Sequence, residues 1–257
     1  MTKSVTKAAT TPVTEADIQG HWRRNWLRAS GFEDGTTRVH WVQSGPWCAD
    51  IRVPLIRPPP DAGSLSAMSG ADLALLLSAE GFAGRTSLAG DVCTWARQWN
   101  WRGFPCPVDA GALWFDDRCR LIEDGIHADY REEWVRVPGP GWNAWAVEAG
   151  GMDGMLLAND TGFLLGLGQR EAPALPTLAQ GLRAGDADPA DAAAAFASVY
   201  LIGHWDGARG TADLSTQPFC EGRAVLTRNT DSADLTLPDF HGANATCALH
   251  LTPLSSS

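Results

Sequence analysis

The chain has 257 residues, of which 44% are hydrophobic and 19% are charged, and its formal net charge at pH 7 is -10. This length suits two domains of roughly 120 residues each, and the apolar content argues against disorder over most of the chain. The acidic balance, without any run of basic residues, argues against a nucleic-acid partner. No apolar window approaches the roughly 20 residues that span a bilayer, so we expect no membrane segment.

The N-terminal segment 1–15 contains two lysines but lacks the apolar region of a secretory signal. We therefore expect a flexible leader there and a cytoplasmic location. Six cysteines are scattered without a Cys-x-x-Cys pair, and in a chain with no export signal we expect them to stay reduced. The six histidines are dispersed, so we expect no metal, and no motif indicates a cofactor.

In the first half, turn signals recur at intervals of about 8–12 residues between short segments rich in β-branched and aromatic residues, which is typical of an antiparallel barrel or sandwich. Ser69 is expected to begin a short helix over 71–80 that Gly81 ends. The predicted strands are 21–27, 37–43, 47–53, 84–88, 91–101, 111–115, 120–123 and 129–137.

Pro-Gly-Pro-Gly at 138–141 predicts the domain boundary, which divides the chain into 16–138 and 139–257. The Ala-, Asp- and Pro-rich stretch 170–195 predicts two helical turns, with Asp188 as a cap before Pro189 at the first helical position. The predicted turns are 178–183 and 190–195, and the predicted strands are 143–149, 154–158, 161–168, 196–205, 210–215, 224–228, 234–237 and 245–251.

Each half contains a Gly-x-Trp motif, at 20–22 and 203–205. Four longer strings, VHWVQSGPWCADIRVP, GDVCTWARQWNW, RLIEDGIHADYREEW and STQPFCEG, resemble bacterial relatives of the fungal Hri-type family, which is named for a protein kinase partner. The resemblance extends over about 20–228. It implies an all-β fold of two consecutive antiparallel calycin- or lipocalin-like barrels with short helical crossings, in which the Trp of Gly-x-Trp plugs a barrel end. It implies no reaction, cofactor or catalytic residue.

Strand alternation over 91–101 places Trp95, Arg97 and Trp99 on one face, which its aromatic content assigns to the barrel interior. A buried guanidinium needs a carboxylate or an anionic ligand, because an unpaired charge there is costly. Arg97 is therefore expected either to hold a ligand or to form a structural ion pair. Asp50 and Arg52 share a strand face. They form either a polar floor inside the barrel, with Asp50 as the partner of Arg97, or a solvent-facing pair, and both alternatives stay open.

The segment 123–130 gathers two carboxylates, His127, a further aspartate and Tyr130 around one turn. Histidine beside carboxylates suits general acid–base catalysis, and Tyr130 could donate a proton to a developing oxyanion. The same residues also fit a solvated hairpin turn.

We expect the protein to bind a small, flat, acidic or aromatic organic molecule in a tryptophan-lined barrel, since an eight-stranded barrel has room for one ligand. The expected ligand site lies in the first half, and a homodimer is left open. One alternative is a cofactor-independent isomerase, lyase or hydrolase that uses His127 and Tyr130. Another is a protein-interaction module whose barrels are plugged by tryptophan. The expected ligand-binding residues are Trp41, Gln43, Asp50, Arg52, Trp95, Arg97 and Trp99.

Overall fold

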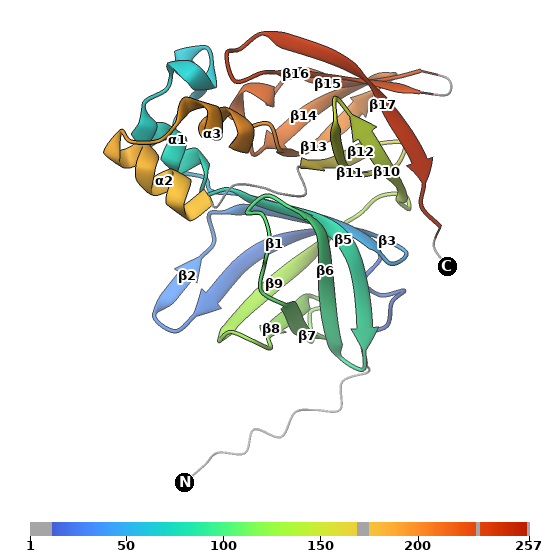
Figure 1. The fold of residues 1–257 in the computed structure, drawn as a ribbon. Helices are drawn as coiled ribbons and strands as arrows, with labels where there is room; N and C mark the ends of the chain where they lie inside the picture. The colour runs from blue at the N-terminus through green and yellow to red at the C-terminus, as the bar shows by residue number, and fades with distance from the viewer. Residues whose placement is uncertain (1–11, 169–174, 230–231, 256–257) are drawn as a thin grey trace.

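The computed structural model describes residues 12–168, 175–229 and 232–255. Two consecutive antiparallel barrels lie one above the other, and the helices α1, α2 and α3 gather beside the second barrel (Figure 1). The predicted all-β fold of two eight-stranded barrels with few short helices is confirmed. In the described part of the chain, no helix combines the length and the apolar character that a membrane crossing needs.

The first barrel follows the order β1-β3-β4-β5-β6-β7-β8-β9 and closes where β1 pairs with β9. A short strand that the sequence did not predict, β2, forms a hairpin with the end of β1. The strands are β1 (Gly20–Ala29), β2 (Phe32–Asp34), β3 (Arg38–Ser44), β4 (Trp47–Val53), β5 (Glu80–Ala89), β6 (Val92–Asn100), β7 (Asp109–Phe115), β8 (Leu121–Gly125) and β9 (Tyr130–Val137).

The second barrel runs in chain order from β10 to β17 and closes by the pairing of β10 with β17. Its strands are β10 (Asn143–Ala149), β11 (Met152–Ala158), β12 (Gly162–Gly168), β13 (Val199–Asp206), β14 (Arg209–Ser215), β15 (Ala224–Arg228), β16 (Ala233–Pro238) and β17 (Asn244–Pro253). The chain passes from one barrel to the other between Val137 and Asn143, across the Pro-Gly-Pro-Gly segment.

The helices occupy the two long connections. The β4–β5 connection contains the 3-10 helices η1 (Pro60–Ala62) and η2 (Leu65–Ala67), followed by α1 (Gly70–Leu76), whose N-cap is Ser69. The β12–β13 connection contains α2 (Leu175–Ala184) and α3 (Pro189–Ala195), and Asp188 caps α3 as predicted. A further 3-10 helix, η3 (Pro218–Cys220), follows β14. Of the stretch 170–195, residues 170–174 lie outside the described part of the chain.

The prediction that Gly81 ends the first helix is wrong. Gly81 instead lies in β5 and pairs with Ile51 of β4. A Cβ atom added to Gly81 would lie 2.4 Å from the Cγ of Tyr200 in the second barrel. The glycine is needed there because the two barrels pack closely at this point, and not because a helix ends.

The expected leader, 1–15, falls largely on residues 1–11, which lie outside the described part of the chain. From residue 12 onward the chain packs on the first barrel. Val13 and Ile18 are buried, and the indole nitrogen of Trp22 donates to the carbonyl of Ile18 at 2.8 Å. These contacts place the tryptophan of the first Gly-x-Trp motif in the core.

A shared apolar core joins the two barrels. Outward-facing residues of β4, such as Ala49 and Ile51, cluster with Met155, Leu164 and Tyr200 of the second barrel. Strand β4 is therefore buried on both faces, since its other side chains point into the first barrel. This two-sided burial decides which polar residues of β3 and β4 meet the interior and which meet the neighbouring barrel.

Candidate functional site

Tryptophans fill the interior of the first barrel. The ring of Trp41 lies 6.2 Å from that of Trp22, 5.7 Å from that of Trp95 and 5.8 Å from that of Trp134. All four side chains are buried. The cavity that remains among the interior residues measures about 10 Å³, which is room for about one water molecule. This space among the described residues is too small for the organic ligand that we expected the barrel to enclose.

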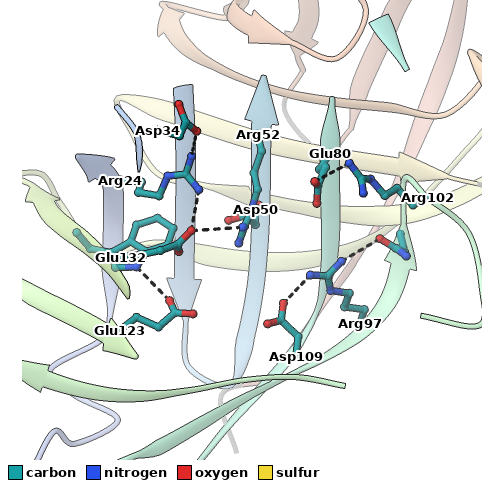
Figure 2. A network of polar contacts seen from close by, with 12 residues as sticks. Arg24, Asp34, Asp50, Arg52, Glu80, Arg97, Arg102, Asp109, Glu123 and Glu132 are labelled. Atoms are coloured by element: carbon teal, nitrogen blue, oxygen red, sulfur yellow. Dashed lines mark hydrogen bonds and ion pairs between the residues drawn. The ribbon is translucent and has the colours of Figure 1, made fainter. Parts of the chain in front are cut away.

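A network of charged side chains joins the strands of the first barrel (Figure 2). Arg24 is paired with Asp34 at 2.6 Å and with Glu132 at 2.7 Å. Arg52 is paired with Asp50 at 2.8 Å and lies 3.7 Å from Glu132. Burial raises the pKa of Asp50, while Arg52 opposes that shift. Of the two alternatives for Asp50 and Arg52, the interior one holds, but the partner of Asp50 is Arg52 and not Arg97.

Arg97 forms a structural ion pair. Its guanidinium donates to Asp109 at 2.5 Å and to Asn100 at 3.3 Å, and it stacks over the ring of Phe82 at 4.2 Å. The side chains of Arg97 and Asp109 are 16% and 17% exposed, so the pair is mostly desolvated. The protein thus supplies the anion that a buried Arg97 requires.

The predicted common face of Trp95, Arg97 and Trp99 is wrong for Trp99. The pairing of β5 with β6 shifts register between Ala83 and Gly84, which are opposite Trp99 and Arg97. Such a bulge inserts one residue and reverses the alternation that follows it. Trp95 therefore points into the first barrel, whereas Trp99 packs against the core shared by the two barrels.

The side chains of Trp41 and Gln43 do lie together inside the barrel, but they bind each other. The indole nitrogen of Trp41 donates to the amide oxygen of Gln43 at 3.2 Å, and the hydroxyl of Thr86 donates to the same oxygen at 2.9 Å. The amide nitrogen of Gln43 donates to the carbonyl of Gly45 at 2.8 Å. These hydrogen bonds satisfy the polar groups of the pair within the protein.

The expected acid–base residues face different environments. The hydroxyl of Tyr130 donates to Glu123 at 2.7 Å, and burial, followed by the charge of Glu123, raises the pKa of Tyr130. Burial, followed by the charge of Glu132, raises the pKa of Glu123 to about 8. His127 is exposed in the turn 126–129. The hydroxyl of Tyr130 is thus directed at a buried carboxyl group, away from the exposed turn that carries His127.

A larger space lies between the barrels, where the sequence did not place a site. This cleft measures about 320 Å³. The first barrel contributes Arg38, His21 and His40 from the outer faces of β1 and β3. The end of β9 contributes Val137, and the connection and the second barrel contribute the remaining residues, which are Pro138, Gly139, Trp142, Asn159, Thr161, Gly162, Ile202, Gly203, Asp213 and Leu214.

The two histidines of the cleft are hydrogen bonded to each other. The Nε2 of His21 lies 2.9 Å from the Nδ1 of His40, and the ring of Trp142 meets that of His21 edge-on. Burial lowers the pKa of His21 to about 4 and that of His40 to about 3, with neighbouring positive charges adding to the effect. Both rings are therefore neutral at pH 7, so one donates to the other and one outer nitrogen remains a donor.

Arg38 provides positive charge in the cleft. Its Nε is buried and has no hydrogen-bond partner among the described residues. Burial lowers the pKa of Arg38, although Glu221 partly offsets this. Glu221 itself pairs with Arg57. At the rim, Asp213 accepts a hydrogen bond from His204 at 2.8 Å, and both side chains are more than half exposed.

The sequence contained one signal of this site. Residues 38, 40 and 42 alternate with the interior-facing Val39, Trp41 and Gln43, so a buried interior face implies that Arg38 and His40 point outward together. That a second barrel covers this outer face could not be deduced from local pattern. In the part of the chain that the structure describes, no group of three histidine, cysteine, aspartate or glutamate side chains is placed to hold a metal.

Fold and site together define a two-barrel protein with a filled first barrel and a cleft between the barrels that both Arg38 and Asp213 line. No protein-family model matches the chain, and no curated protein matches it. Among solved structures, the chain is similar to the uncharacterized protein YLR301w from Saccharomyces cerevisiae. The TM-score is 0.49 and the identity 10%, over 90% of this chain and 98% of that chain. A similarity at this level carries no argument about function.

Proposed function

We propose that the protein binds a small organic anion in the cleft between its two barrels. The observation that carries this proposal is Arg38, which lines the cleft and whose buried Nε has no hydrogen-bond partner among the described residues. The cleft volume of about 320 Å³ falls within the range of about 300–1,000 Å³ that is usual for small-molecule sites. A carboxylate matches the planar fork of a guanidinium, so it is the anion we favour.

The rest of the cleft suits the body of such a ligand. Trp142, Ile202 and Leu214 offer apolar wall, and the neutral histidine pair offers a hydrogen-bond donor without adding charge. The expected class of ligand, flat and acidic, is thus retained, while its site moves from the barrel interior to the cleft. We also propose, on the basis of the four sequence strings alone, that the protein is related to the Hri-type family.

The test is a titration with a matched pair of compounds, benzoate and benzamide, which share a flat ring and differ in charge. Binding is followed by intrinsic tryptophan fluorescence and by calorimetry. We expect saturable binding of benzoate and much weaker binding of benzamide. Because a hydrogen bond to a charged group contributes about 1.5–3 kcal/mol, Arg38→Ala should raise the dissociation constant of benzoate at least tenfold.

The control variant is Arg118→Ala, which removes the same charge from an exposed turn outside the cleft. It should bind benzoate as the unmodified protein does. Equal affinity for benzoate and benzamide, or an unchanged affinity after Arg38→Ala, would contradict the proposal. Mass spectrometry of the bound compound completes the test, because an altered mass would favour the enzyme alternative over simple binding.

A further inference from the structure

A second cavity opens at one end of the second barrel, on the side of α3. It measures about 420 Å³. Its apolar lining comes from Met152, Val199, Leu235 and Leu237 of the barrel and from Phe196 at the end of α3. Val199 and Leu235 also belong to the core of the second barrel, so the cavity continues the barrel interior outward.

The contrast with the first barrel explains why there is space here. The first barrel is closed by four tryptophans and an ion-pair network, whereas the core residues of the second are mostly leucine, valine and alanine. The rings of Phe196 and Phe240 stack at 6.3 Å with an angle of 28° and form one wall. Because the wall is aromatic and the floor is aliphatic, the cavity favours an apolar occupant.

The charged residues around the cavity disfavour an acidic ligand. No lysine or arginine is found among the described residues that line it. Asp239 lies at the rim, where its Oδ1 accepts from the backbone nitrogens of His241 and Ala243 at 2.9 Å. The buried amide of Gln217 is already bonded to the carbonyl of Pro238 and to the thiol of Cys220. An anionic ligand would therefore meet the carboxylate of Asp239 without a lysine or arginine to pair with among the described lining residues.

We propose that this end of the second barrel binds one compact, uncharged apolar molecule, at a site separate from the cleft between the barrels. The cavity volume, its hydrophobic wall and its acidic rim all favour a neutral ligand. The two sites then differ in the charge of what they accept. The cleft takes an anion through Arg38, and the barrel mouth excludes one.

The experiment uses two fluorescent dyes of similar shape, neutral N-phenyl-1-naphthylamine and anionic 8-anilinonaphthalene-1-sulfonate. The full chain should bind the neutral dye saturably with a stoichiometry of one. Ala193 lines the cavity on α3, so Ala193→Phe should fill it and weaken binding of the neutral dye at least tenfold. The matched control is Ala190→Phe, an exposed position on the same helix outside the cavity, and it should leave binding unchanged.

Arg38→Ala separates this proposal from the one before it, because loss of the cleft arginine should leave binding of the neutral dye intact. The proposal is overturned if the neutral dye does not bind, or if Ala193→Phe and Ala190→Phe bind it equally. It is also overturned if the sulfonate binds with the same affinity as the neutral dye and Ala193→Phe weakens that binding too. Circular dichroism spectra of both variants establish that a loss of binding does not come from unfolding.

Discussion

Glu123 should make the protein less stable as the pH rises from neutral to mildly alkaline values. The residue is 3% exposed, and its carboxyl group accepts hydrogen bonds from Tyr130 at 2.7 Å and from Trp134 at 3.1 Å. Directly across the sheet lies Glu132, its partner in the β8–β9 pairing. Burial and this second carboxylate both disfavour ionisation, which raises the pKa of Glu123 to about 8 from the usual 4.5.

The direction in which the free energy of unfolding changes with pH follows from which state, folded or unfolded, holds the proton. Between pH 4.5 and 8 the folded protein keeps a proton on Glu123 that the unfolded chain has already lost. The free energy of unfolding therefore falls with increasing pH in this window, by at most about 1.4 kcal/mol per pH unit for one group. From pH 7.0 to 8.5 the two pKa values correspond to a loss of about 1.3 kcal/mol.

The measurement is urea unfolding at pH 7.0 and 8.5, for the unmodified protein and for Glu123→Gln. Glutamine offers one carbonyl acceptor instead of two carboxyl oxygens, so at pH 7.0 the variant should be less stable than the unmodified protein by about 1 kcal/mol. The fall of about 1.3 kcal/mol between pH 7.0 and 8.5 should disappear from the variant, because glutamine does not titrate. Other titrating groups, including the cysteines, affect both proteins alike. Identical pH dependence in the two proteins would refute the reasoning.

Three further predictions follow from the packing. Replacing Arg97 with alanine leaves Asp109 buried without a partner, so thermal and urea unfolding should show a loss of about 3 kcal/mol; a loss below 1 kcal/mol would mean that the pair is solvent-screened. Gly81→Ala should destabilise the protein by at least 2 kcal/mol, because the added Cβ would lie 2.4 Å from the Cγ of Tyr200; an unchanged urea midpoint would show that the interface yields. An aromatic disulfide reagent at pH 8 should modify exposed Cys119 first and leave Cys48, whose pKa burial raises to about 12, unreacted until unfolding; mass spectrometry after peptide digestion identifies the order, and early modification of Cys48 would contradict it.

Local pattern in the sequence was enough for the strands of the two barrels other than the short β2, because turn residues and β-branched segments are local signals. The strand over 47–53 and the cap at Asp188 agree with the structure residue for residue. The prediction of a helix end at Gly81 was wrong because the role of this glycine depends on a contact that is not local. Glycine there is required by contact with Tyr200, a residue more than a hundred positions away in the chain, and no local rule distinguishes this from a helix cap.

The candidate site was harder to predict because it also depends on contacts between residues that are far apart in the chain. Alternation assigns residues to two faces, and it assumes that one face is wet. On β4 both faces are dry, since Asp50 points into the first barrel and Ile51 into the core shared with the second. That is why the sequence left the Asp50–Arg52 pair undecided. Trp99 was assigned to the wrong face of β6 because no residue in the sequence of this strand signals the β-bulge.

The two barrels are filled by different kinds of side chain, and the two proposed sites follow from this difference. In the first barrel, tryptophans and ion pairs bond largely to one another, and the outer face of the barrel carries His21, Arg38 and His40. An aliphatic interior cannot close its own end as completely, so the second barrel retains a cavity of about 420 Å³ beside α3. In the two proposals, recognition of charge therefore falls to the surface between the barrels, where the buried Nε of Arg38 has no hydrogen-bond partner among the described residues, and recognition of apolar shape falls to the open end of the second barrel.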